Sequence, residues 1–217
     1  MKRKCFLLAI VLAFSLLMAT NASAYLLTLT DPNTDLSGYA GPYAQVNVVL
    51  SSPLNSPQTA TITATALNGY GLGDGAALAL NVNGTFSVVV GSISYTPLPG
   101  YTPPTNYVTS ELWPNGHVDG FGYFNLALNA KDFSDPLATI SFTLTAAAGT
   151  WTNDQSVLTL NNKNYLAAAH VKPAGTNVLT GFAAGPGTGA VVPISAAAWL
   201  LGSGLLGLVV IRRRFKK

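Results

Sequence analysis

The middle of this chain alternates apolar and polar side chains with a period of two residues, and this limits what it can fold into. In Thr61–Leu67, threonine alternates with isoleucine or alanine, and in Thr139–Thr145 hydroxyl residues alternate with larger apolar ones. Successive side chains of a β-strand point to opposite faces, so this period gives each segment one apolar face. No window between residues 25 and 191 has a comparable helical period. The pattern therefore predicts half-buried strands.

Other segments of this region carry the same signal. Asn83-Gly84 lies between the apolar rows Leu78–Val82 and Phe86–Val90 and predicts a two-residue β-hairpin. The remaining candidate strands are Tyr25–Thr30, Ala44–Leu50, the inward row Phe124, Leu126 and Leu128, Val157–Leu160, Tyr165–Val171 and Val178–Phe182. Nine or ten short strands separated by Gly and Pro predict an all-β ectodomain over residues 25–182. We expect an antiparallel two-sheet sandwich, of which a jelly roll is one form, with an up-and-down barrel as the alternative.

The charges are concentrated at the two ends of the chain. Eight of the eleven basic residues lie before residue 5 or after residue 211. Residues 25–191 contain all eight acidic residues but only three basic ones, Lys131, Lys163 and Lys172. The net charge of this region is therefore −5. A nucleic-acid-binding protein needs clustered cations to displace phosphate counterions, so the composition excludes that class.

The first 24 residues have the three parts of a secretory signal peptide. Lys2–Lys4 form a basic region, Phe6–Met18 an apolar core, and Ala22 and Ala24 the small residues of a cleavage site. A core of 13 residues is short for a bilayer span, although an uncleaved anchor is the alternative. Cleavage after Ala24 removes Cys5, the only cysteine, so the mature domain would depend on its hydrophobic core instead of disulfides.

The C-terminal residues predict a transmembrane helix. Ile194–Ile211 is an apolar run of 18 residues, and as a helix it would measure about 27 Å, close to the ~30 Å hydrocarbon thickness. Pro193 precedes it, where the missing N–H costs a helix little. The cytoplasmic basic stop consists of Arg212, Arg213, Arg214, Lys216 and Lys217. Each such charge costs about 2.5–3.5 kcal/mol at the bilayer centre, so we expect residues 25–191 to lie outside the membrane.

The last 26 residues also form a three-part motif. The tetrapeptide Val192-Pro193-Ile194-Ser195, the run AAAWLLGSGLLGLVV and the tail RRRFKK together resemble the PEP-CTERM sorting signal, especially its VPLPA-type variant. Unlike that variant, this chain has Ile194-Ser195 in place of Leu-Pro. A eukaryotic GPI signal also ends in an apolar tail but lacks the terminal cations.

The resemblance implies a route and a setting. Family members are exported by the Sec machinery and held in the inner membrane of a Gram-negative bacterium before processing. They are substrates of an exosortase, a membrane-embedded cysteine transpeptidase. Cleavage near the motif implies release or transfer of the ectodomain to the cell surface or the exopolysaccharide matrix.

Two segments interrupt the succession of strands. Tyr95–Pro114 contains five prolines and four aromatic residues, which predicts a long aromatic loop. Residues 183–191 contain Gly185-Pro186-Gly187 and predict a flexible tether to the sorting signal at 192–217. Because sugar faces stack on exposed rings, the candidate glycan contacts are Tyr101, Tyr107 and Trp113.

One acidic segment has the oxygen pattern of a calcium loop. Asp31, Asn33 and Asp35 stand at alternate positions, but Pro42 occupies the place of the twelfth-position Glu. An Asx-rich turn explains the segment equally well.

A second group combines a histidine with two carboxylates. Glu111, His117 and Asp119 lie within nine residues and have the side chains for acid–base chemistry or metal binding. However, the pairs at 115–116 and 119–120 predict turns, which favours a structural role.

The rest of the chain carries no recognisable catalytic motif. His170 follows three alanines and is expected to be a half-buried strand residue. No G-x-S-x-G, HExxH or phosphate-binding loop is present. We therefore expect no catalytic residues, metal or cofactor. The leading hypothesis is an exported structural or adhesive matrix protein, and the alternative is a carbohydrate-binding β-sandwich at the cell surface.

Overall fold

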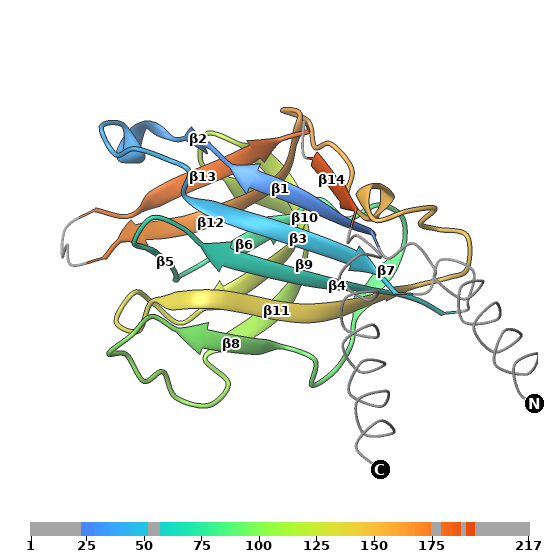
Figure 1. Ribbon diagram of the computed structural model, residues 1–217, viewed down its shortest axis with the longest axis horizontal. Helices are drawn as coiled ribbons and strands as arrows, with labels where there is room; N and C mark the ends of the chain where they lie inside the picture. Colours follow the sequence, from blue (N-terminus) through green and yellow to red (C-terminus); the bar gives the residue numbers. More distant parts are fainter. Residues whose placement is uncertain (1–22, 52–56, 175–178, 188–189, 194–217) are drawn as a thin grey trace, which may run out of the picture. The chain divides into compact units, whose positions relative to one another are not determined.

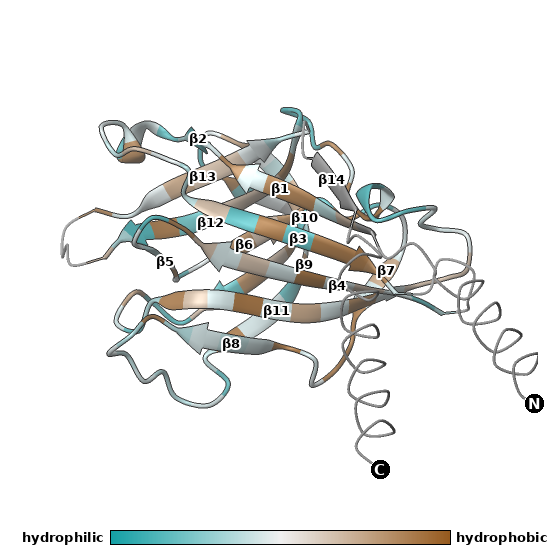
Figure 2. Cartoon of the chain, in the orientation of Figure 1, coloured by the Kyte–Doolittle hydropathy of each residue, from teal (hydrophilic) through white to brown (hydrophobic). Residues whose placement is uncertain are grey.

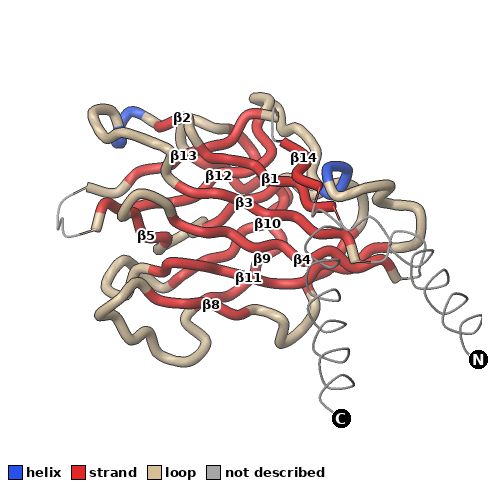
Figure 3. The backbone as a smooth tube through the Cα atoms, in the orientation of Figure 1, coloured by secondary structure: helices blue, strands red, loops and turns tan. Residues whose placement is uncertain are grey.

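The computed structural model describes residues 23–51, 57–174, 179–187 and 190–193, which are almost entirely strands and loops (Figure 1, Figure 3). The chain divides into two compact units, and nearly all described residues belong to the one formed by Ala24–Val192. Its only helices are two 3-10 turns of three residues each, within the described part. The predicted all-β, antiparallel class is confirmed.

Between Ser23 and Pro193, the described elements follow one another without a long helix. The strands are β1 (Ser23–Leu29), β2 (Asp31–Pro32), β3 (Ala44–Leu50), β4 (Gln58–Ala66), β5 (Tyr70–Leu72), β6 (Leu78–Leu80), β7 (Phe86–Val88), β8 (Ser94–Pro97), β9 (Val108–Val118), β10 (Gly122–Ala130), β11 (Leu137–Ala146), β12 (Tyr165–Pro173), β13 (Gly181–Pro186) and β14 (Ala190–Pro193). The 3-10 turns are η1 (Thr34–Leu36) and η2 (Gln155–Val157).

The strands form two layers, as a β-sandwich requires. One layer has the order β14-β1-β3-β4-β11, with β7 and β8 on the other edge of β11. The other layer has the order β2-β13-β12-β6-β10-β9. In Figure 1, β1, β3, β4 and β11 lie nearer the viewer, and β6, β9 and β10 lie fainter behind them.

The layers are joined into one hydrogen-bonded network, where the sequence predicted two separate sheets. The short strand β5 makes the connection, because Leu72 is opposite Val171 of β12 and also opposite Leu137 of β11. A three-residue strand at the corner can therefore pair with both layers.

The core forms from the apolar faces that the alternation predicted. Ile62 of β4 is opposite Val48 of β3 on one side and Phe142 of β11 on the other, and all three side chains are buried. Figure 2 shows the corresponding alternation of hydropathy along β3. Full burial of each such side chain contributes about 1.5–3 kcal/mol, so this row is a main source of stability.

The hairpin predicted at Asn83-Gly84 is wrong. The strand before it, β6, pairs with β10 and β12, whereas the strand after it, β7, pairs with β11. The turn therefore carries the chain from one layer to the other. Gly84 has a φ of 73°, as a turn requires, and the Asn83 carbonyl accepts a hydrogen bond from Nε1 of Trp151 at 2.9 Å. This long-range contact, not the local turn chemistry, decides where the chain goes.

The predicted inward row of β10 is interrupted at Phe124. Leu126 and Leu128 belong to the main core, but Phe124 is buried in a second cluster with Ala79 and Ala168. The register with β9 shifts between Phe124 and Leu126. A bulge disrupts the regular alternation of side chains, which explains why Phe124 packs elsewhere.

The segment predicted to be a tether begins as a strand. β13 extends through Pro186, and Ala183 and Ala184 are fully buried against β12. A Cβ on Gly185 would lie 2.8 Å from Cγ of Leu27, so packing requires the small residue there. In the sequence these small residues indicated a flexible segment. In the structure they allow β13 to pack closely against its neighbours.

The predicted aromatic loop is also shorter than expected. β8 and β9 include both of its ends, leaving only residues 98–107 as loop. The turn predicted at Asn115-Gly116 is instead part of β9, whereas Asp119-Gly120 does form a turn. The ring of Trp113 lies directly on Gly116, where a Cβ would come within 1.8 Å of Cδ2.

The terminal predictions fall partly or wholly outside the described residues. Ala22, the membrane helix 194–211 and the basic residues after it lie outside, whereas Ala24 is buried in β1. In the described ranges, none of the helices has the length and apolar character that crossing a bilayer would need.

Candidate functional site

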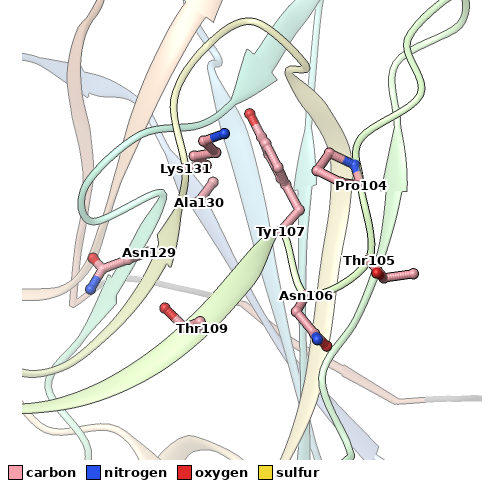
Figure 4. Close-up of a pocket in the computed structure, with 8 residues that line it drawn as sticks. All are labelled: Pro104, Thr105, Asn106, Tyr107, Thr109, Asn129, Ala130 and Lys131. Atoms are coloured by element: carbon pink, nitrogen blue, oxygen red, sulfur yellow. The ribbon is translucent and has the colours of Figure 1, made fainter.

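An open groove of about 420 Å³ lies where the loop before β9 meets the end of β10 (Figure 4). Thr109 of β9 and Asn129 of β10 are opposite each other in the antiparallel register, so two adjacent strands contribute to it. The loop supplies the other side. The lining residues are Pro104, Thr105, Asn106, Tyr107, Thr109, Asn129, Ala130 and Lys131.

Four polar side chains of the groove remain open to solvent. Thr105, Asn106, Thr109 and Lys131 are all exposed, and no side-chain hydrogen bond within the described residues holds any of them. They present two hydroxyls, an amide and an ammonium group beside the apolar atoms of Pro104 and Ala130. This combination suits a hydroxylated ligand and lacks a paired acid and base.

Tyr107 is a rigid wall of the groove. Its ring is 4% exposed, and its hydroxyl donates to the backbone carbonyl of Asp132 at 2.6 Å and to Oδ1 of the same residue at 3.1 Å. Burial, followed by the hydrogen bond and charge of Asp132, raises the pKa of this phenol. Hydrogen bonds from Ser134 lower the pKa of the Asp132 carboxyl, so it remains an anionic acceptor.

Asn129 connects the groove to the neighbouring surface of β9. Its Oδ1 accepts a hydrogen bond from the backbone N–H of Ala76 at 2.8 Å, and its Nδ2 donates to Oε2 of Glu111 at 3.1 Å. Both the oxygen and the nitrogen of the Asn129 amide are therefore hydrogen-bonded. The side chain orients Glu111 along the strand beside Thr109.

The three predicted glycan contacts do not form one platform. Tyr107 is buried in the groove wall, Tyr101 is 37% exposed on the loop, and Trp113 is half-buried on β9 in contact with the second core cluster. Of the three, only Tyr107 lines the groove. The other polar lining residues were missed because the groove joins positions about twenty residues apart.

Glu111, His117 and Asp119 do not form the predicted group. Each of them contacts a different residue. Glu111 accepts from Asn129, His117 has its ring 5.2 Å from that of Tyr123, and Asp119 accepts from Asn33 at 3.1 Å. A bulge and a turn separate these positions. Among the described residues no group of three metal-ligating side chains comes together.

The acidic segment Asp31–Asp35, which had the oxygen pattern of a calcium loop, forms a turn organised by Asn33. This side chain is 6% exposed and donates from Nδ2 to Asp35 and to Asp119, and its Oδ1 accepts from the N–H of Phe182 at 3.1 Å. Asp31 instead accepts from Oη of Tyr165 at 3.4 Å. The alternating oxygens thus hold η1 against β13.

His170 is half-buried on β12, as the sequence predicted. Its ring stacks on Phe182 with a centroid distance of 4.2 Å and meets Phe133 edge-on at 4.9 Å. Burial lowers the pKa of this imidazole, and the charge of Asp74, 3.9 Å away, partly opposes that effect. The neutral ring therefore acts as a packing residue.

The sorting motif is described only in its first half. Val192 and Pro193 lie in β14, which pairs with β1, whereas Ile194 and Ser195 are outside the described residues. Comparison of the chain with protein-family models, with curated proteins and with solved structures finds no match.

Proposed function

We propose that this protein is an exported structural or adhesive protein of a Gram-negative cell surface or extracellular matrix. In this proposal, a signal peptide is removed after Ala24, and an exosortase recognises the C-terminal signal that starts at Val192. The ectodomain performs no catalysis and acts through its surface. The precursor is held in the inner membrane by the helix 194–211 until it is processed.

One agreement between independent observations carries the proposal. The compact unit of the structure spans Ala24–Val192, and the processing signals read from the sequence end at Ala24 and begin at Val192. Export and sorting would therefore remove almost only what lies outside the compact unit, because cleavage after Ala24 takes from β1 just its first two residues. A domain processed at both ends needs this arrangement to survive.

The character of the β surface supports an adhesive role. The solvent-facing positions of β4 and β11 carry hydroxyl groups, and Thr63 and Ser141 hydrogen-bond across the two strands at 2.9 Å. Ser87 and Thr145 form a second such pair at 2.9 Å. Neutral hydroxyl-rich strands of this kind can contact polysaccharide or neighbouring protein without charge repulsion.

Deletion of residues 192–217 from the full chain tests the proposal. We expect the truncated protein to accumulate in the soluble periplasm, whereas the complete chain reaches surface or matrix fractions. Replacement of Arg212, Arg213 and Arg214 by lysine is the matched control, because it keeps the charge and should leave sorting unchanged. Identical fractionation of the truncated and complete chains would overturn the proposal.

A second candidate function is carbohydrate binding at the groove. It is favoured by the four open polar side chains beside Tyr107 and by the shallow, accessible form of the groove. Pull-down of the detergent-solubilised full chain on a panel of bacterial and plant polysaccharides tests it. Retention that is lost in Asn106→Ala and Thr109→Ala, but kept in the control Thr61→Ala on the opposite layer, would favour this function. No retention on any polysaccharide would end it.

A further inference from the structure

The strands at the ends of the hydrogen-bonded network differ greatly in length. Four of these edge strands are short: β2 has two residues, β7 three, and β8 and β14 four each. The fifth, β9, has eleven residues and, among the described strands, pairs only with β10. Native proteins commonly shorten edge strands because an open edge can pair with another chain. This fold leaves one edge long.

The regular part of the β9 edge points backbone groups away from the protein. Ala130 is opposite Val108, but its N–H donates to the carbonyl of Asp74 on the far side at 3.0 Å. Hydrogen bonding alternates along an antiparallel pair, so Val108, Ser110 and Leu112 direct their N–H and C=O groups to the open edge. The ladder becomes irregular beyond Leu112, where the bulge begins.

The side chains of this segment do little to block pairing. Ser110 is exposed, and Leu112 is 60% exposed, one of the few large apolar side chains left in solvent. Glu111 is the only charged residue from Val108 to Leu112, and no lysine or proline interrupts that stretch. Pro114 and the bulge hinder pairing with another chain only at the residues after Leu112.

We infer that β9 is an interface with a second copy of this chain, formed by antiparallel pairing about a twofold axis through Ser110. This deepens the proposed structural function and rests on it for its biological meaning. The axis is at the midpoint of the regular segment. It places Leu112 beside Val108 of the other copy and Glu111 beside Thr109 of the other copy.

Charge selects this register over its neighbour. A twofold axis at Glu111 would set the two carboxylates directly opposite each other, which is destabilising. The axis at Ser110 instead sets each carboxylate opposite a hydroxyl group. It also brings the exposed Leu112 next to Val108 of the other copy, a residue whose side chain is buried in the main core. A second copy in this register therefore pairs with this edge without placing like charges opposite each other.

Cysteine crosslinking measures the register directly. Position 109 of one copy and position 111 of the other form a non-hydrogen-bonded pair, whose Cα atoms are about 4.5 Å apart and within disulfide reach. Two differently tagged full-length chains are co-expressed, one with Thr109→Cys and one with Glu111→Cys, both with Cys5→Ala. We expect the mixed pair to crosslink at least about fivefold more than either variant with itself. Equal or absent crosslinking of the mixed pair would overturn the register.

A charge variant tests the association itself. Ser110→Lys places two ammonium groups opposite each other and should weaken self-association of the detergent-solubilised full chain at least about tenfold in sedimentation experiments. Ser94→Lys on the short edge β8 is the matched control and should associate like the unmodified chain, and circular dichroism checks that both variants fold. An unmodified chain that stays monomeric, or a Ser110→Lys chain that associates unchanged, would refute the interface. Neither result depends on sorting, so failure of the proposed function would be seen separately in the fractionation of the truncated chain.

Discussion

The side-chain amide of Gln58 pairs with both backbone groups of Trp151. Nε2 of Gln58 donates to the Trp151 carbonyl at 2.7 Å, and Oε1 accepts from the Trp151 N–H at 2.8 Å. Both residues are fully buried. Since the indole of Trp151 also donates to Asn83, this pair joins β4, the segment after β11 and the crossing between layers. The Gln58 amide therefore makes with the Trp151 backbone the two hydrogen bonds that a neighbouring strand would otherwise make.

We predict that Gln58→Ala destabilises the fold by about 2–6 kcal/mol. The substitution leaves a buried N–H and a buried C=O of Trp151 without their partner, and each unsatisfied group costs about 1–3 kcal/mol. Urea denaturation followed by tryptophan fluorescence measures the change. Gln155→Ala, at an exposed position of η2, is the control and should change stability by less than about 0.5 kcal/mol. Equal midpoints for the two variants would contradict the role of Gln58.

Gly116→Ala should displace Trp113 from its present position. The added Cβ would overlap the indole, so we expect a loss of about 1–3 kcal/mol, as in other overpacked sites. The tryptophan emission should shift to longer wavelength as the ring becomes more exposed. Gly75→Ala is the matched control, since nothing lies within 4 Å of the position where its Cβ would be built. An unchanged emission spectrum in Gly116→Ala would show that the ring does not lie there.

The stability of the fold should fall as the pH drops below 6.5, in part through His170. Burial lowers the pKa of His170 from its usual 6.5, so in this range the unfolded chain binds a proton that the folded chain resists. The contribution is fully present above pH 6.5 and is lost as the pH falls toward the lowered pKa. His170→Phe should flatten this part of the pH profile of unfolding, because phenylalanine keeps the aromatic stack without titrating.

His117→Phe provides the control for that measurement. His117 is exposed and its ring lies 5.2 Å from that of Tyr123, so this variant makes the same exchange of imidazole for phenyl outside the core. If His170→Phe kept the full slope below pH 6.5, another group would have to account for the pH dependence.

Tyr107→Phe should loosen the wall of the groove. The variant loses the hydroxyl that bonds to Asp132, and the net cost of such a bond is about 0.5–1.5 kcal/mol. We expect a matching decrease in thermal stability and faster amide exchange in residues 105–107. Tyr101→Phe removes a hydroxyl from an exposed residue and should have no measurable effect. Protection that stays the same in Tyr107→Phe would mean that the loop is held by other contacts.

The candidate site was predictable only in part. Counting back from the turn at Asp119-Gly120 gives the correct pair of Val118 and Gly122, but it would place Asn129 opposite Glu111. The bulge shifts the register by two residues and sets Asn129 opposite Thr109. Pro114 signals an irregularity in this strand, but it does not give the size of the shift, which accompanies the packing of Trp113 against Gly116. Tyr107 was identified as an aromatic residue of interest, but its burial depends on Asp132.

The sequence by itself determined that the middle of the chain forms strands and which face of β3, β4 and β11 is buried. A period of two residues depends only on residue order, so it can be recognised in the sequence without knowledge of any long-range contact. Only the tertiary structure decided that the chain changes layers at Asn83-Gly84, that β13 continues through Pro186 and that β9 stays open at its edge. Each of these depends on contacts between residues far apart in the chain, whose free energy outweighs the local preference of a turn or a flexible segment.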